Sequence, residues 1–287
     1  MPAIFGPAIL GPAILWPAIL GIVNITADSF SDGGRFLETG AALAHARALA
    51  AEGAQIIDLG AAASNVDARP VGAAEEIRRL DPLIEALAAD GIPVSVDSFA
   101  PEVQRLAIRR GAAFLNDIQG FPDASFYPEL AAASCRLIVM HAVHGRGRAQ
   151  RVELSADAVW DRIHAFFAER VGALERAGIA RERLILDPGM GFFLSSQAEA
   201  SLRVLAGLGE LKAAFGLPVL VSVSRKSFLR ALTGRAIAAE LGAASLVAEL
   251  YATAQGADYI RTHDPGALAD GLKVVAAVRA QAARSAH

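Results

Sequence analysis

The sequence predicts a single α/β domain built as a closed parallel (β/α)8 barrel of the TIM type. Three observations lead to this fold class: eight short apolar runs, helical segments between them, and polar side chains at the carboxyl ends of the runs. Apolar runs that alternate with amphipathic segments are typical of β-α units around a parallel sheet. The length of 287 residues fits one barrel domain, and 54% hydrophobic residues can supply its core. A doubly wound open sheet is the alternative, because periodicity does not report closure.

The eight apolar runs are the predicted strands. β-branched and aliphatic residues dominate them, as expected for strands buried on both faces. They are AILGIVN (18–24), QIIDL (55–59), PVSVD (93–97), AFLND (113–117), RLIVMH (136–141), RLILD (183–187), PVLVSVS (218–224) and DYIRT (258–262). Eight strands are enough to close a barrel.

The predicted helices lie between these runs. Apolar residues recur at helical spacing over 37–51, 73–89, 156–177 and 236–254, with charged residues on the opposite face. His45 and His164 lie on these helices, and we expect both to face solvent. A glycine after a helix suits a chain that must turn toward a strand. Such glycines stand at Gly53, Gly91, Gly111, Gly178 and Gly256.

Residues 1–17 form an apolar, proline-rich repeat ahead of the first strand. The unit PAI, followed by Leu or Phe and then Gly or Trp, occurs four times over the first 21 residues. Prolines at 2, 7, 12 and 17 would break a membrane-spanning helix, and no basic segment precedes the repeat as in a signal peptide. We therefore expect an extension at 1–17 and a catalytic domain at 18–287; secretion is the less favoured alternative.

Charge and cysteine content limit the partners. The chain carries 27 Lys and Arg against 30 Asp and Glu, which leaves no broad basic face for nucleic acid, and we expect no membrane partner. The single cysteine, Cys135, excludes an intramolecular disulfide and suits a cytoplasmic protein. Because it opens an apolar run, we expect an inert core residue.

Polar side chains stand at the carboxyl end of every predicted strand. A closed barrel brings these ends together around one mouth, where such folds bind their ligands. A strand-end cap would explain any one of them, but eight ends in succession indicate a pocket. We assign Asp58 and Asp117 to loop structure. The complete set is Asn24, Asp58, Asp97, Asn116, Asp117, His141, Asp187, Ser224 through Lys226, Arg261 and His263.

The side-chain types indicate an aromatic heterocycle beside an anion. Asp97, Asn116 and Asp187 match the donor-rich edge of an aminopyrimidinone ring. Arg261 and His263, two residues apart on one strand end, suit phosphate or diphosphate.

Other catalytic arrangements are not evident from the sequence. Without H-E-x-x-H or cysteine-ligand spacing, a metal would be a magnesium shared with phosphate oxygens. Ser64 and Ser224 have no evident His and Asp partners for nucleophilic catalysis.

Eight collinear segments resemble the successive motifs of dihydropteroate synthases. They are GIVNITADSFSDGGRF, GAQIIDLG, VSVDS, GAAFLNDI, LIVMH, LILDPGMGF, VSVSRKSFL and GADYIRTHDP. The resemblance implies a (β/α)8 barrel, usually a homodimer, in which p-aminobenzoate displaces diphosphate from 6-hydroxymethyl-7,8-dihydropterin diphosphate, with Mg²⁺ as cofactor. Two alternatives stay open: a folate-dependent methyltransferase, and a catalytically silent pterin-binding paralogue. A silent paralogue would lack Asn24, Arg261 or His263, and all three are present.

The resemblance also implies a role for individual positions. The pterin-binding residues are expected to be Asp97, Asn116, Met140, Asp187, Gly191 and Lys226. The diphosphate-binding residues are expected to be Asn24, Arg261 and His263, with Asn24 also the metal ligand. Catalysis is expected from Asp97, Lys226, Arg261 and His263. A mobile lid is expected at Asp28, Ser29, Phe30, Asp32, Gly33 and Gly34.

Two segments depart from the usual family pattern. Ser64 and Asn65 stand where the family usually has Thr and Arg, and Phe193 and Leu194 replace a glycine and a lysine. These departures resemble the mobile sulfonamide-insensitive members of the family. They imply a site for p-aminobenzoate, and for discrimination against sulfonamides, at Ser64, Asn65, Phe192, Phe193, Lys226 and Ser227. Ordinary loop packing is the alternative for the two phenylalanines.

Overall fold

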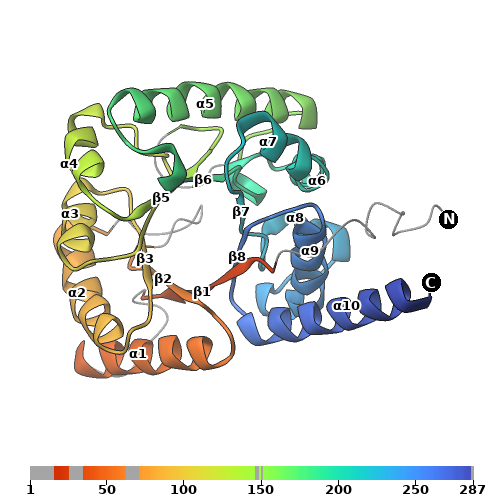
Figure 1. Cartoon of the computed structure of the whole chain (residues 1–287), viewed down its shortest axis with the longest axis horizontal. Helices are drawn as coiled ribbons and strands as arrows, with labels where there is room; N and C mark the ends of the chain where they lie inside the picture. The colour runs from red at the N-terminus through yellow and green to blue at the C-terminus, as the bar shows by residue number, and fades with distance from the viewer. Residues whose placement is uncertain (1–15, 26–34, 63–70, 146–148, 150, 286–287) are drawn as a thin grey trace.

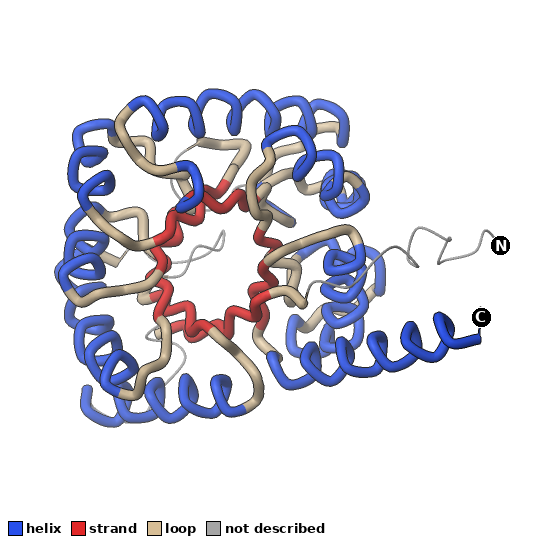
Figure 2. The backbone as a smooth tube through the Cα atoms, in the orientation of Figure 1, coloured by secondary structure: helices blue, strands red, loops and turns tan. Residues whose placement is uncertain are grey.

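Eight parallel strands surround the molecular axis in a computed structural model that describes residues 16–25, 35–62, 71–145, 149 and 151–285. They are β1 (Ala18–Asn24), β2 (Ile56–Gly60), β3 (Val94–Asp97), β4 (Phe114–Asp117), β5 (Arg136–Met140), β6 (Leu184–Asp187), β7 (Leu220–Val221) and β8 (Tyr259–Thr262). Their order is β6-β5-β4-β3-β2-β1-β8-β7, and a parallel bridge between Leu186 and Val219 joins the two ends. The barrel is therefore closed (Figure 2), and the open-sheet alternative is wrong.

Helices form an outer ring around the strands (Figure 1). They are α1 (Arg35–Ala51), α2 (Ala73–Ala89), α3 (Pro101–Arg109), α4 (Tyr127–Ala132), α5 (Ala156–Arg176), α6 (Ala198–Ala206), α7 (Leu208–Phe215), α8 (Ser227–Thr233), α9 (Gly242–Ala254) and α10 (Pro265–Ser285). All five glycines predicted to follow helices have positive φ, from 72° to 117°, a region that only glycine adopts without strain. The predicted helix ends are confirmed at these positions.

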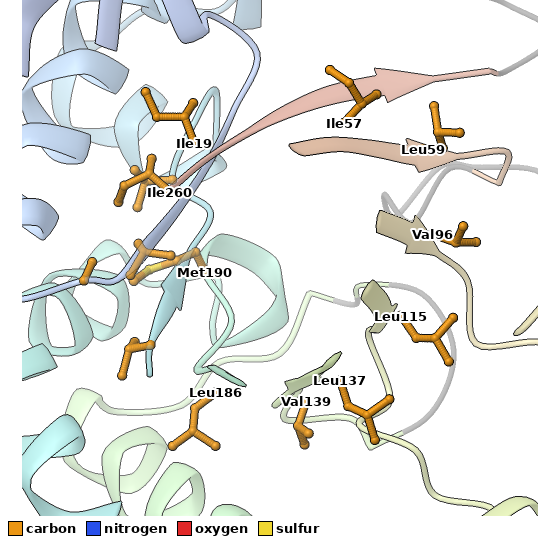
Figure 3. Close-up of a cluster of buried hydrophobic side chains, with 14 of the residues drawn as sticks. Ile19, Ile57, Leu59, Val96, Leu115, Leu137, Val139, Leu186, Met190 and Ile260 are labelled. Carbon is orange, nitrogen blue, oxygen red and sulfur yellow. The ribbon is translucent and has the colours of Figure 1, made fainter. Parts of the chain in front are cut away.

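The alternation of side chains along each strand divides the core into two shells. One set points outward and packs under the helices, and Figure 3 shows members of it, such as Ile57, Leu115 and Leu186. The other set points inward. Its lowest layer forms a separate apolar cluster of Leu20, Ile56, Phe114, Ile138, Ile185, Leu220 and Tyr259. Each of these seven residues comes from a different strand, so the barrel is filled at the bottom and is not a pore.

Two predicted elements differ in extent from the structure. The predicted strand 218–224 is ordered as a strand only over Leu220–Val221, because residues after it turn toward α8 and Lys226 N–H donates to Val223 O. The predicted helix 236–254 begins with a 3-10 turn at Ala238–Leu241 before α9 starts at Gly242.

The single-residue predictions outside the site have mixed outcomes. Cys135 is buried as predicted, and burial raises the pKa of its thiol. His45 is exposed as predicted. The prediction for His164 is wrong: its ring is half-buried between Trp160 and Phe215, with centroids 4.9 and 5.6 Å away. Aromatic neighbours on α5 and α7 cover a position that periodicity alone left on the surface.

No single helix of the described residues is long and apolar enough to cross a membrane. Only α8 together with the segment Ala238–Ala254 reaches that length and composition, and the two are bent by 79°.

Candidate active site

The inward-facing positions change from apolar to polar in the layer above the apolar cluster that fills the bottom of the barrel. Two residues after each member of that apolar cluster, the chain carries Ile22, Asp58, Asn116, Met140, Asp187, Ser222 and Arg261. On β3, Asp97 follows Ser95 with the same spacing. Most of these side chains line one pocket at the carboxyl end of the barrel. Its walls are Asp97, Asn116, Ile118, Met140, Asp187, Gly189, Met190, Phe193, Ser222, Lys226 and Arg261.

Arg261 of β8 is bound by two carboxylates, from β2 and β3. Its Nε donates to Asp58 Oδ2 at 2.7 Å, and its Nη2 donates to Asp97 Oδ2 at 2.8 Å. The Asp58 side chain is fully buried. The structure therefore places Arg261 among the predicted pterin-binding carboxylates, although the sequence suggested only an anion-binding role.

Asn116 and Ser222 present polar atoms that the described residues leave without partners. Asn116 Nδ2 lies 3.4 Å from Asp58 Oδ1, while Asn116 Oδ1 and Ser222 Oγ are buried with no hydrogen-bond partner among the described residues. A buried polar atom without a partner costs about 1–3 kcal/mol. A ligand with N–H groups at this depth would recover that free energy.

Burial shifts the ionisable groups of the pocket toward neutral pKa values. It raises the pKa of Asp97 to about 7, against the opposing effect of Arg261, and the pKa of Asp187 to about 6. Burial, helped by Arg261, lowers the pKa of Lys226 to about 8. Acids and a base poised near neutrality in one cleft are typical of a functional site.

The turn after β6 brings an aromatic wall against Lys226. Gly189 and Gly191 have φ of 76° and 65°, and a Cβ on Gly191 would lie 2.9 Å from Ser227 Oγ, so glycine is required there. This close approach sets Phe193 below Lys226, whose Nζ lies 5.2 Å from the ring centroid. The arrangement joins the predicted Gly191, Phe193, Lys226 and Ser227.

The two predicted phenylalanines have different surroundings. Phe193 is buried against Ile118 and Met140 and lines the pocket. Phe192 is only partly buried and lies under the Arg151 guanidinium, 5.6 Å from its ring centroid. Only Phe193 therefore forms part of the pocket wall described here.

His263 and Ser224 lie together at the rim. His263 Nδ1 is 3.0 Å from Ser224 Oγ, so Ser224 has a histidine neighbour that was not evident from the sequence. Burial and the neighbouring Arg225 lower the pKa of His263 to about 3, which makes it neutral at pH 7. A histidine that resists protonation is a poor base for a serine nucleophile but can still donate a hydrogen bond.

Asn24 and Asp97 converge over Gly60. A Cβ on Gly60 would lie 3.4 Å from Asn24 Oδ1 and 3.8 Å from Asp97 Oδ2, so the missing side chain leaves these oxygens together at the mouth. Other predicted positions lie outside the described residues: Ser64, Asn65, Asp28, Ser29, Phe30, Asp32, Gly33 and Gly34.

Sequence reasoning missed Asp58 and Ser222 as site residues and was right about Asp117. Asp58 and Ser222 are inward residues, whereas Asp117 faces outward and accepts hydrogen bonds from Gln119 N and Gln104 Nε2. The alternation along each strand distinguishes these residues, and sorting the strand-end residues by it would have found Asp58.

Known proteins similar to this chain identify its family. The Pterin binding enzyme family matches residues 20–263. Dihydropteroate synthase type-2 of Escherichia coli is 60% identical over 259 residues, which cover 90% of this chain and 95% of that protein. The chain belongs to the dihydropteroate synthase family. As a dihydropteroate synthase it is a transferase, and the methyltransferase alternative is not supported.

The subgroup of this dihydropteroate synthase is also confirmed. The type-3 enzyme of Escherichia coli is 52% identical over 254 residues, covering 88% of this chain and 96% of that protein. Together with types 1 and 2 it represents the mobile sulfonamide-resistance forms of the family.

Solved dihydropteroate synthases share the fold. The Xanthomonas albilineans enzyme with 4-aminobenzoic acid superposes with a TM-score of 0.84 at 39% identity, covering 93% of this chain and 94% of that one. The same enzyme in complex with 7,8-dihydropteroate gives a TM-score of 0.81. The predicted barrel and family are therefore confirmed.

Proposed function

We propose that this dihydropteroate synthase condenses 6-hydroxymethyl-7,8-dihydropterin diphosphate with p-aminobenzoate and releases diphosphate and 7,8-dihydropteroate. The observation that carries the proposal is the inward cluster of carboxylates, amide, lysine and arginine at one end of the barrel. That cluster has acceptors for a donor-rich ring and cations for a departing anion.

The pterin ring would occupy the deep part of the pocket. Asp97, Asn116 and Asp187 would accept hydrogen bonds from its N–H groups, and Asn116 Oδ1 is a buried acceptor without a partner among the described residues. Met140 and Gly191 would bound the ring, and Lys226 would donate to its acceptor edge.

Bond cleavage would develop charge at both ends of the substrate. The C–O bond to diphosphate breaks as the pterin methylene becomes cationic, and the amine nitrogen then forms the new C–N bond and loses a proton to solvent. Arg261 would offset the negative charge on the leaving group, while neutral His263 would donate a hydrogen bond. Asp97 and Asp187 would stabilise the electron-deficient ring. An aniline nitrogen is already nucleophilic, so no strong base is needed.

The residues at the mouth fit a magnesium ion shared with the substrate. Within the described part of the chain no three His, Cys, Asp or Glu side chains converge as a metal cage. Mg²⁺ commonly takes one or two protein oxygens and completes its shell with water and phosphate. Asn24 Oδ1, beside Gly60, is such an oxygen. When bound, the ion would neutralise charge on the diphosphate.

Phe193 supports discrimination against sulfonamides. The drugs share the aniline of p-aminobenzoate but are bulkier where the substrate ends in a flat carboxylate. A buried phenyl ring in the pocket wall would obstruct that extra volume. A loss of about 3 kcal/mol of binding free energy would weaken binding of the drug roughly a hundredfold. Lys226 and Ser227 would remain available to the smaller carboxylate. Phe192, further out, would restrict the entrance.

The chain would act as a homodimer through an apolar face on α8, α9 and α10. Five of the eight exposed large hydrophobic side chains in the described structure belong to this region: Leu232, Ile237, Val247, Val274 and Val278. On α10, Val274 and Val278 continue the row that starts at Gly271, which packs against Leu246 and Leu250 of α9. Exposed apolar side chains on neighbouring helices favour a protein partner.

The catalytic unit would be residues 18–287, with 1–17 as a separate extension whose first 15 residues lie outside the described structure. We place the enzyme in the cytoplasm, where its lone Cys135 thiol would stay reduced.

The test is diphosphate release by the purified protein supplied with dihydropterin diphosphate, Mg²⁺ and p-aminobenzoate, with and without excess sulfamethoxazole. We expect turnover that survives the drug. Turnover that the drug abolishes would support the synthase activity and contradict the proposed discrimination by Phe193. No turnover, with pterin still bound, would favour the silent pterin-binding paralogue.

A further inference from the structure

Helix α9 carries two buried polar side chains that have no part in the proposed chemistry. Ser245 and Glu249 are 5% and 2% exposed and, four residues apart, lie on the same side of the helix. Small apolar residues, Ala248 and Ala252, complete that side. Buried polar groups on a helix face that packs on a barrel cost free energy unless they have partners.

Glu249 is bound to the end of β8. Its carboxyl is hydrogen-bonded to the Thr262 hydroxyl, while Oε1 has no partner among the described residues. Burial raises the pKa of Glu249 to about 7, with Thr262 acting in the opposite direction. The charges of Asp264 and Arg225 also affect this pKa, Asp264 raising it and Arg225 lowering it.

Thr262 separates the two residues that face the leaving group. Side chains alternate along a strand, so Thr262 points outward to α9 while Arg261 and His263 point into the mouth. Thr262 is fully buried, and its Oγ1 also accepts the Asp264 N–H at 3.2 Å. Fixing the Thr262 side chain therefore fixes the rotation of the strand end and the direction of both neighbours.

Ser245 is bound to the turn after β7 in the same way. Its Oγ accepts the Arg225 N–H at 3.0 Å. Arg225 has a φ of 59°, a left-handed conformation that costs a residue with a Cβ about 1–2 kcal/mol. Lys226 follows immediately, so the hydrogen bond from α9 helps to hold the turn that presents the lysine to the pocket.

We propose that Ser245 and Glu249 are positioning residues for the pterin substrate: Glu249 acts at its diphosphate end, and Ser245 acts at its pterin ring. From one side of α9 they fix two separate strand ends, the β7 turn that carries Lys226 and the β8 end that carries Arg261 and His263. The inference rests on the proposed function, since it assumes that Arg261 and His263 meet the leaving group and that Lys226 meets the pterin ring. Neither residue touches the substrate in this arrangement; both act through hydrogen bonds to the backbone or side chain of a neighbouring strand end.

The test compares the affinity for Mg²⁺-diphosphate with the affinity for 6-hydroxymethylpterin, both by calorimetry. Thr262→Val and Glu249→Leu remove the same hydrogen bond from its two sides, and Ser245→Ala removes the other. We expect the dissociation constant for Mg²⁺-diphosphate to rise about tenfold in Thr262→Val and Glu249→Leu, the effect of losing one well-placed hydrogen bond. In Ser245→Ala the dissociation constant for 6-hydroxymethylpterin should rise by a similar factor. In each variant the affinity for the other ligand should change less than twofold, and the KM for dihydropterin diphosphate should rise in all three.

Two variants control for general damage. Thr253→Val removes a buried hydroxyl from the same helix, but that hydroxyl donates only to Glu249 O within α9, so it should leave both affinities unchanged. Glu249→Gln keeps an acceptor for Thr262 and should restore diphosphate affinity to within twofold of the parent.

Two results would overturn the positioning role: parental affinity for both ligands in all three test variants, or an equal loss of pterin and diphosphate affinity in each variant together with a lower melting temperature. The proposed function fails separately, if the parent makes no dihydropteroate. Because both affinities are measured without turnover, the positioning role is decided in either case.

Discussion

Arg261 carries a positive charge that two carboxylates share. Its Nη2 lies 2.6 Å from Asp58 Oδ2 and 2.8 Å from Asp97 Oδ2, and Asp58 is the more deeply buried of the two acids. A charge-assisted hydrogen bond of this kind both aims the guanidinium and holds its place in the ring of strands. The direction of Arg261 therefore depends on a residue that does not line the pocket.

Replacing Asp58 by Asn tests that dependence. The substitution keeps the shape but removes one charge, so we expect kcat/KM to fall about 10–100-fold, corresponding to about 1.5–3 kcal/mol. Asp117→Asn is the matched control, because Asp117 is equally buried but faces outward, and it should change kcat/KM less than threefold. A folded Asp58→Asn protein with parental kcat/KM would contradict the assigned role.

The Asp187 carboxyl should make the protein less stable as the pH rises. Its pKa is raised by burial from 3.8 to about 6, so the folded state binds this proton more tightly than the unfolded state. Stability from this group is present below about pH 4 and is lost as the pH rises through about 6. Asp187→Asn should therefore raise the free energy of unfolding by about 1–3 kcal/mol at pH 7.5, and by about half that at pH 5.

Urea denaturation at the two pH values measures the difference, and the same variant should lose most of its activity. An equal gain at both pH values, or a loss at pH 7.5, would show that the Asp187 carboxyl does not carry this cost.

Phe193→Gly tests the aromatic wall against the drug. Removing the ring opens the pocket beside Lys226, so the inhibition constant of sulfamethoxazole should fall roughly a hundredfold while the KM for p-aminobenzoate changes less than fivefold. Phe192→Gly is the comparison, because its ring lies further out under Arg151, and we expect a smaller effect. Unchanged inhibition in Phe193→Gly would assign the ring to loop packing.

Most of the pocket residues could be predicted from the sequence, but not their contacts. Asp97, Asn116, Asp187 and Lys226 stand at strand ends and do meet in one pocket. The pairing of Arg261 with Asp58 joins residues 203 positions apart, and no local pattern reports such a distance. The orientation of Ser224 toward His263 depends in the same way on two neighbouring strand ends.

The elements of the barrel could be predicted best where local chemistry determines them. The predicted strand 18–24 coincides with β1, and the predicted helix 73–89 coincides with α2. β7 was overestimated because Ser222 through Ser224 continue an apolar alternating pattern while their backbone leaves the sheet. That departure is a tertiary effect, set by the turn that presents Lys226.

The turn after β6 should tolerate no side chain at its first glycine. A Cβ on Gly189 would lie 2.4 Å from His141 O, at a φ of 76°. Gly189→Ala should therefore destabilise the protein by about 3 kcal/mol or more, adding steric overlap to left-handed strain. Gly91→Ala has a similar φ of 72° and nothing within 4 Å, so strain alone should cost it about 1–2 kcal/mol. Thermal unfolding distinguishes the two, and equal losses would mean that the turn can yield.

At the scale of the whole molecule, the apolar face on α8 to α10 should mediate self-association. The double variant Val274→Glu with Val278→Glu places two charges on side chains that are 63% and 64% exposed in the single chain. If a second copy covers this face, the variant should sediment as a monomer at concentrations where the parent is a dimer. Phe99→Glu, on the opposite side of the barrel, should leave the dimer intact. If the parent sediments as a monomer, the proposed dimer does not form. If the double variant stays dimeric, the interface lies elsewhere.

The barrel closes between β6 and the residues just before β7, through the bridge between Leu186 and Val219 and the Leu186 N–H to Pro218 O hydrogen bond. With so few bonds at this position, the barrel should open here first, because local unfolding begins where the fewest contacts must be lost. Asp187 ends β6 on one side of this closure, and Lys226 follows β7 on the other side. A ligand bound to both Asp187 and Lys226 bridges the two sides of the closure. The enzyme's resistance to unfolding and its occupancy by substrate therefore rise together.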